Sequence, residues 1–125
     1  MLNYTNVITE EKSYSGLQMK EIKPVMKLII RGKKREFLSA IGKSLNLLLP
    51  TEANTSSRSD KLTALWLSPD EWMVYSNETI NSESNEYETE NLLNKNISKT
   101  NLGAVTNVTD QFVLINIKGD KIFDL

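Results

Sequence analysis

The sequence predicts an α+β fold of the ferredoxin-like kind, in which a split β-α-β-β-α-β order forms an antiparallel sheet with two helices on one face. Three observations predict it. Two apolar runs, each carrying a tryptophan, flank a Ser-Pro-Asp-Glu turn at residues 68–71, which is typical of a β-hairpin. One stretch with helical spacing lies on each side of this hairpin. Strand-like runs open and close the pattern, which completes the order.

Before the hairpin, the sequence predicts an arm, a strand and a helix. Residues 1–20 are polar and lack a sustained period, so we expect a flexible N-terminal arm before a single domain over residues 21–125. A strand is expected at residues 25–32, where an apolar run is closed by a glycine. Apolar residues then recur at helical spacing over residues 33–48, and Pro50 is expected to end this helix.

After the hairpin, the chain is first very polar and then regains structure-forming patterns. Residues 77–86 are rich in Asn, Ser and Glu and are expected to form a connector. The elements expected beyond it are a helix at residues 87–98, strands at residues 104–108 and 111–117 with a break near Asp110, and the first turns of a helix from residue 120.

Several of the expected strands are apolar on both faces, whereas a lone two-layer domain leaves one sheet face to water. One explanation is that these are central strands whose tryptophans are partly exposed. The other is that a partner domain or subunit covers the helix-free face, because large aromatic patches on an open face are typical of interfaces. The candidate partner-interface residues are Trp66, Trp72, Val74, Phe112 and Leu114.

Composition disfavours several functional classes. The net charge is -1, whereas a nucleic-acid-binding protein normally has a basic face, so no nucleic-acid partner is expected. Cysteine and histidine are both absent, which removes thiol chemistry and zinc sites built on these residues. No apolar run approaches the roughly 20 residues that span a membrane, so we expect a cytoplasmic protein without a membrane partner.

Two charged clusters have simple structural interpretations. Asp70 and Glu71 are adjacent carboxylates, a pattern that can serve acid–base chemistry, but they follow Ser-Pro as ordinary turn residues do. The basic residues of the 31–35 segment lack the spaced glycines of a phosphate loop and are expected to form a solvated junction. We therefore expect no catalytic, cofactor-binding or metal-binding residues in this chain.

Residues 66–74, Trp-Leu-Ser-Pro-Asp-Glu-Trp-Met-Val, resemble a tryptophan-flanked motif of the gamma subunit of heterotetrameric sarcosine oxidase. The resemblance extends over residues 17–125. It departs from the family at Asn107, where the family usually has aspartate, and in the unusually polar loop at residues 77–86. Further segments similar to the family occur in the same order, at residues 28–32, 47–50 and 105–119.

This resemblance implies a fold related to the folate-binding aminomethyltransferase (T-protein) family and a structural, assembly role. It implies a complex that oxidatively demethylates sarcosine to glycine and passes the one-carbon unit to tetrahydrofolate with release of hydrogen peroxide. FAD, FMN, NAD, zinc and tetrahydrofolate would then belong to other subunits, and none to this chain. The implied partners are the other sarcosine oxidase subunits, chiefly the large alpha subunit. The resemblance also implies that the C-terminal part of the family fold is missing from this sequence.

Two other functions stay open at this point. One is a free-standing folate-binding domain related to the T-protein, and the other is a scaffold or ligand-sensing domain of ferredoxin-like order. A scaffold predicts a stable monomer or homodimer, whereas a subunit predicts exposed apolar surface when the chain is expressed alone. In each case the chain itself is not expected to carry a complete active site.

Overall fold

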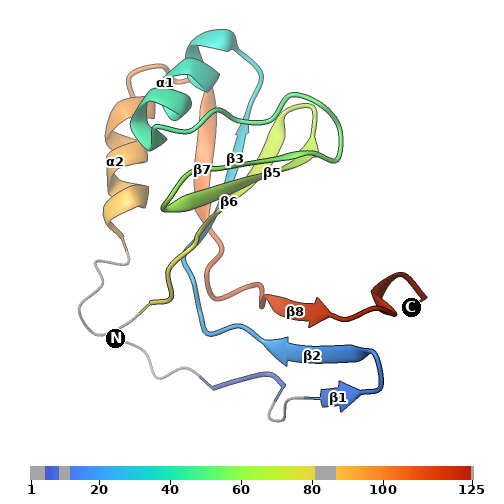
Figure 1. Cartoon of the computed structure of the whole chain (residues 1–125). Coiled ribbons are helices and arrows are strands. Elements are labelled where there is room, and N and C mark those ends of the chain that lie inside the picture. The colour runs from blue at the N-terminus through green and yellow to red at the C-terminus, as the bar shows by residue number, and fades with distance from the viewer. Residues whose placement is uncertain (1–4, 9–11, 81–86, 125) are drawn as a thin grey trace.

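The computed structural model describes residues 5–8, 12–80 and 87–124. Within them it contains two antiparallel sheets and two α-helices, so the predicted mixed α+β class is confirmed (Figure 1). The elements are β1 (Lys12–Tyr14), β2 (Leu17–Glu21), β3 (Lys27–Gly32), α1 (Arg35–Leu45), β4 (Ser56–Arg58), β5 (Leu62–Ser68), β6 (Glu71–Ser76), α2 (Glu88–Ile97), β7 (Gly103–Asn107), β8 (Ile115–Lys118) and the 3-10 turn η1 (Ile122–Asp124).

The larger sheet has the strand order β4-β5-β6-β3-β7, and every neighbouring pair is antiparallel. Both helices lie on the same side of it (Figure 1). Leu28 and Ile30 of β3 are fully buried, and they alternate along the strand because successive side chains of a strand point to opposite faces. The core cluster on the helix-covered face contains Met26, Leu28, Ile30, Phe37, Ile41, Leu45, Leu47, Leu62, Ala64, Val74, Leu93 and Ile97.

Both predicted helices are confirmed, with shorter bounds than the sequence indicated. In α1, Phe37, Ile41 and Leu45 are buried at intervals of four residues, which is the spacing of one helix face. The helix ends at Asn46, which has the left-handed conformation (φ 49°), while the Leu47 N–H bonds the Gly42 carbonyl at 3.1 Å. The prediction that Pro50 ends this helix is therefore wrong, because the left-handed cap acts first.

The tryptophan hairpin is confirmed as β5 and β6. Trp66 and Trp72 are direct cross-strand partners, and a register shift follows between Trp66 and Ser68. The Gly32 N–H bonds the Asp70 carbonyl at 3.0 Å, which ties the turn to the end of β3. The connector predicted at residues 77–86 is described only up to residue 80, and the rest of it lies outside the described residues.

A smaller sheet forms from segments at opposite ends of the sequence, in the order β1-β2-β8. Strands β1 and β2 lie largely within residues 1–20, where the residue pattern has no sustained period and no strand was predicted. They pair with each other and β2 pairs with β8, so that Gln18 lies opposite Lys118. The division of the chain into an arm over residues 1–20 and a domain over residues 21–125 stays a prediction.

The C-terminal strands differ from the prediction in one respect. The break near Asp110 is present, and it separates β7 of the larger sheet from β8 of the smaller one. A strand was expected from residue 111, but residues 111–114 belong to the connector between the sheets, and β8 begins only at Ile115. The helix predicted from residue 120 is limited to the single turn η1.

Candidate partner interface

The five residues predicted to meet a partner occupy three different environments. Trp72 and Val74 are 2% and 0% exposed, and they lie on the helix-covered face of the larger sheet. Trp66 shares this face and is half-buried. Phe112 is 50% exposed and Leu114 is half-buried, and both lie in the connector that leads to β8. The structure therefore brings Trp66 and Trp72 together and separates them from the connector pair.

Trp72 is buried by the loop that follows α1. Its indole Nε1–H donates a hydrogen bond of 2.7 Å to the Pro50 carbonyl. A buried indole needs such a partner, because an unpaired N–H away from water is costly. Trp72 thus anchors this loop against the sheet and has almost no surface left to offer to another molecule.

The helix-free face of the larger sheet carries a different apolar group. Ile29, Met73 and Leu65 are aligned across β3, β6 and β5 as direct cross-strand partners. They alternate with the core residues, so they point away from the helices, and all three are half-buried. This face is apolar at its centre, as the two-faced strand pattern predicted, although it is made of residues other than the five named.

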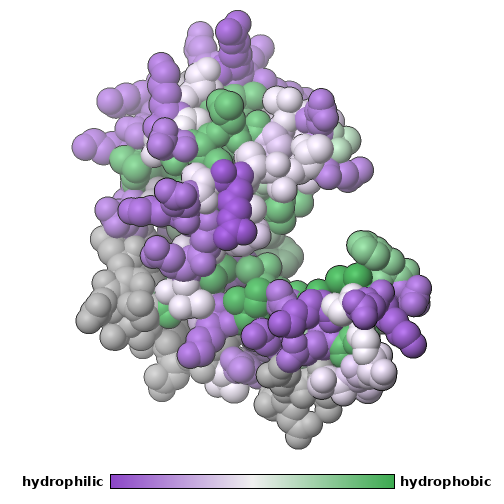
Figure 2. Space-filling view, viewed as in Figure 1, coloured by the Kyte–Doolittle hydropathy of each residue, from purple (hydrophilic) through white to green (hydrophobic). Residues whose placement is uncertain are grey.

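The small sheet is amphipathic. Its ladder places Tyr14, Leu17, Met19, Ile115 and Ile117 on one face, together with Glu21 at the end of β2. We call this the apolar face of the small sheet. The opposite face carries Ser13, Gln18, Lys20, Asn116 and Lys118. In the space-filling view, the small sheet projects beneath the larger body and an open notch separates the two, with hydrophobic residues along the lower side of the notch (Figure 2).

Strand β8 is also an edge of the small sheet. The Ile22 N–H bonds the Leu114 carbonyl at 2.8 Å, and hydrogen-bonded pairs alternate along an antiparallel ladder. The backbone groups of Ile115 and Ile117 therefore point away from β2, toward the open edge. An apolar face beside an unpaired edge is a surface that proteins normally cover. The alternation of Ile115 and Ile117 with polar residues is the sequence signal that would have identified it.

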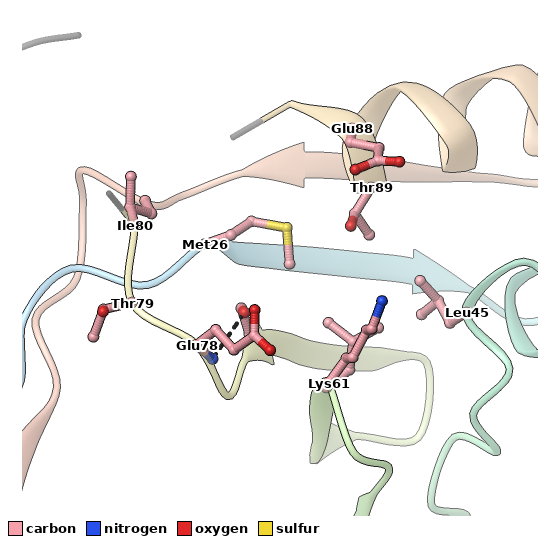
Figure 3. Close-up of a pocket in the computed structure, with 10 residues that line it drawn as sticks. Met26, Leu45, Lys61, Glu78, Thr79, Ile80, Glu88 and Thr89 are labelled. Atoms are coloured by element: carbon pink, nitrogen blue, oxygen red, sulfur yellow. Dashed lines mark hydrogen bonds between the residues drawn. The ribbon is translucent and has the colours of Figure 1, made fainter. Parts of the chain in front are cut away.

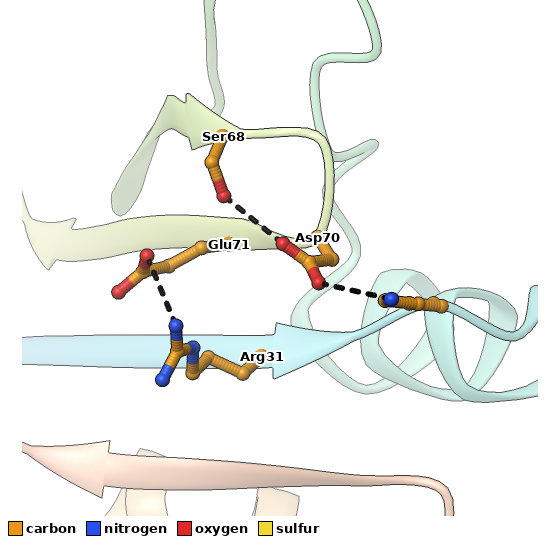
Figure 4. A network of polar contacts seen from close by, with 5 residues as sticks. Arg31, Ser68, Asp70 and Glu71 are labelled. Atoms are coloured by element: carbon orange, nitrogen blue, oxygen red, sulfur yellow. Dashed lines mark hydrogen bonds and ion pairs between the residues drawn. The ribbon is translucent and has the colours of Figure 1, made fainter.

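The two charged clusters of the sequence pair with each other at the hairpin turn (Figure 4). Arg31 lies 3.8 Å from Glu71, and Lys33 lies 3.8 Å from Asp70. The Ser68 hydroxyl bonds the Asp70 carboxylate at 3.1 Å. Such solvent-exposed ion pairs contribute about 0–1 kcal/mol each. These contacts give the carboxylates a role in the turn, as the sequence interpretation expected.

A surface pocket of about 320 Å³ lies between the larger sheet and the start of α2 (Figure 3). Met26, Leu45 and Leu62 supply its apolar part, and Lys61 and Glu78 stand at its polar side. Within the described residues, no ion pair links that lysine to a carboxylate of the pocket.

The part of the chain that the structure describes contains neither a cluster of metal-ligand side chains nor a helix able to span a membrane. No group of three or more acidic side chains there is placed to hold a metal ion, and the sequence has no histidine or cysteine. No described helix has the length and apolar character that crossing a bilayer requires.

The structure defines a mixed α+β domain whose helix-free sheet face has half-buried apolar side chains at its centre. The particular family follows from comparison with known proteins. The model of the sarcosine oxidase gamma subunit family matches residues 31–125, so this chain belongs to that family. No curated protein matches it.

The chain is also similar to a solved chain described as heterotetrameric sarcosine oxidase from Corynebacterium sp. U-96 in complex with pyrrole 2-carboxylate. The TM-score is 0.72 at 16% sequence identity, so this similarity concerns the fold. The match covers 89% of this chain and 54% of the solved chain. This chain therefore spans about half the length of that relative.

Proposed function

We propose that this chain is a non-catalytic gamma-type subunit of a heterotetrameric sarcosine oxidase complex, with a structural role in its assembly. The observation that carries the proposal is the family match over residues 31–125. The complex would oxidise sarcosine to glycine and hand the one-carbon unit to tetrahydrofolate. FAD, FMN, NAD, zinc and tetrahydrofolate would be held by the other subunits.

The composition of this chain agrees with the assignment of the cofactors to other subunits. Structural and catalytic zinc sites are built from Cys, His and carboxylate ligands, and this chain has neither Cys nor His. In the part of the chain that the structure describes, no group of three or more acidic side chains is placed to hold a metal ion. Both observations support the proposal that zinc belongs to another subunit.

The proposal includes a ferredoxin-like arrangement for the larger sheet. In such a fold, the strands of a β-α-β-β-α-β unit lie in the spatial order four-one-three-two. The order β7-β3-β6-β5, with α1 after β3 and α2 after β6, supports this assignment. Strand β4 is then an addition beside β5 at the edge of the sheet.

We propose that the partner, chiefly the large alpha subunit, binds in the notch between the larger body and the small sheet and contacts the surfaces that border it. Phe112 and Leu114 and the apolar face of the small sheet would supply the central contacts. This is supported by the exposure of Phe112 and of Ile115, which is 42% exposed. Trp66 would lie at the edge of this interface. Trp72 and Val74 are buried and would not contact the partner directly.

Co-expression with alpha, beta and delta subunits tests the proposal. The Ile115→Ser and Phe112→Ser variants should each reduce co-purification of the alpha subunit roughly tenfold, because a central apolar contact is typically worth more than 1 kcal/mol. Leu92→Ser on α2 is a matched control, because Leu92 is 43% exposed and lies away from the small sheet. It should leave association unchanged.

The possible failures have different meanings. If the wild-type chain associates with none of the three subunits, the subunit proposal is wrong, and a stable monomer would favour a free-standing scaffold. If the wild type associates and both variants associate equally well, only the interface assignment is wrong.

A further inference from the structure

The most unusual side chain in the molecule is a buried lysine. Lys27 begins β3 and pairs across the ladder with Tyr75, on the face of the sheet opposite the main core. It is only 2% exposed, and it is the largest polar side chain among the fully buried residues of the described chain. Lysines are almost never buried to this extent unless their ammonium group is bound by specific partners.

The ammonium group of Lys27 is bound by two backbone carbonyls. It donates hydrogen bonds of 3.1 Å to the Val25 carbonyl and 3.1 Å to the Thr109 carbonyl. The backbone of Lys27 reinforces the same contact, because its N–H bonds the Thr109 hydroxyl at 3.0 Å and its carbonyl accepts the Val108 N–H at 2.9 Å. Val25 and Val108 are both buried beside it and exclude water.

These two carbonyls belong to the two connectors between the sheets. Val25 lies in residues 22–26, which lead from β2 to β3, and Thr109 lies in residues 108–114, which lead from β7 to β8. In Figure 1, both connectors leave the larger sheet side by side and descend to the small sheet. The Lys27 side chain therefore joins the only two segments that link the sheets within the described chain.

We propose that Lys27 is a clasp that fixes the orientation of the small sheet relative to the larger sheet, and so sets the shape of the notch between them. This inference does not depend on the identity of any partner. A hydrophobic residue of the same length would fill the space, but it would leave both carbonyls unpaired. The connectors would then depend on backbone bonds, such as the Ile22–Leu114 and Val108–Lys27 bonds. The neutral amine keeps two N–H donors, so the clasp works whether or not Lys27 is protonated.

The absence of native cysteine makes a direct distance measurement possible. Lys43 of α1 and Lys118 of β8 are both exposed, so cysteines introduced at these positions can carry spin labels. The labels report the distance between the helix-covered body of the larger sheet and the small sheet. We expect one narrow distance distribution in the otherwise wild-type protein. Lys27→Met should broaden or shift that distribution. Lys20→Met on the polar face of the small sheet is the matched control and should leave it unchanged.

Hydrogen exchange supplies a second readout on the same variants. In Lys27→Met, amides of residues 22–26 and 108–114 should exchange about tenfold faster, because both hydrogen bonds from the Lys27 amine are lost there. Amides in the centre of β3 and β6 should keep their protection. A narrow distribution identical to that of the wild type in Lys27→Met would overturn the proposal.

If Lys27→Met does not fold, Lys27→Gln decides the question. Its amide keeps a polar end in the site, but the side chain ends one bond earlier than lysine and cannot keep both bonds of 3.1 Å to the Val25 and Thr109 carbonyls. The distance distribution should broaden in this variant too, and an unchanged distribution would overturn the clasp.

Discussion

A glycine pair in the larger sheet makes room for the ring of Phe37. Gly32 and Gly103 are direct partners between β3 and β7, and Phe37 of α1 is fully buried against them. A Cβ atom on Gly32 would lie 2.3 Å, 2.4 Å and 3.0 Å from three atoms of the Phe37 ring. The close approach of the helix to the sheet therefore depends on the missing side chain.

Gly32→Ala should destabilise the protein by about 1–3 kcal/mol, the usual cost of overpacking a core. Phe37→Leu alone should cost about 1–2 kcal/mol. Because all three close contacts of the new methyl group are to the Phe37 ring, the double variant should be more stable than the sum predicts. We expect a coupling of at least about 1 kcal/mol, within the range measured for residues in contact.

Gly103→Ala is the control for this cycle. A Cβ there would lie 2.5 Å from the Phe37 ring but also 2.4 Å from the Arg31 carbonyl oxygen. This oxygen is a backbone atom and cannot move by a change of rotamer. Shortening Phe37 should therefore rescue Gly103→Ala less than Gly32→Ala. Urea unfolding, followed by the fluorescence of the buried Trp72, measures each variant. Additive effects in the Gly32 cycle, within about 0.5 kcal/mol, would refute the packing argument.

Two further predictions concern the buried polar groups. Trp72→Phe removes the donor to the Pro50 carbonyl and should lower the free energy of unfolding by about 1–2 kcal/mol. Proteolysis of residues 46–55 should become faster, because the loop loses its anchor. Unchanged cleavage there would contradict the anchoring role. Burial lowers the pKa of Lys27 from 10.5, and the Asp110 carboxylate offsets part of this effect. The unfolded chain therefore binds more protons in that range, so the free energy of unfolding should rise as the pH increases through the folded pKa toward 10.5. In urea titrations at increasing pH, Lys27→Met should lose this rise, and parallel curves for the two proteins would contradict it.

Local patterns were sufficient to predict every strand of the larger sheet except β4, which lies in a polar stretch without a strand pattern and was not predicted. The hairpin was visible because Trp66 and Trp72 flank a turn written with Ser, Pro and Asp, and α1 because its apolar residues repeat at intervals of four. These signals are contained within about fifteen residues. The order of elements followed from them, and the mixed α+β class followed from the order.

The small sheet could not be predicted in the same way. Its strands are three to five residues long, and β2 finds β8 only through a contact between residues 18 and 118. Period-two patterns also do not say which face of a strand meets the helices. Trp72 was therefore expected at a partner surface, whereas the loop carrying Pro50 covers it. The buried role of Lys27 has no sequence signal, because a lone lysine at the start of a strand is ordinary.

The pairing of Gln18 with Lys118 also sets an order of events during synthesis. The N-terminal strands β1 and β2 leave the ribosome early, but their third strand is made only after the whole larger sheet has been translated. Until then a two-stranded hairpin is marginal in water, and its apolar residues have no partner strand. The surface that borders the notch is thus completed after the larger sheet, on a body that is already able to fold.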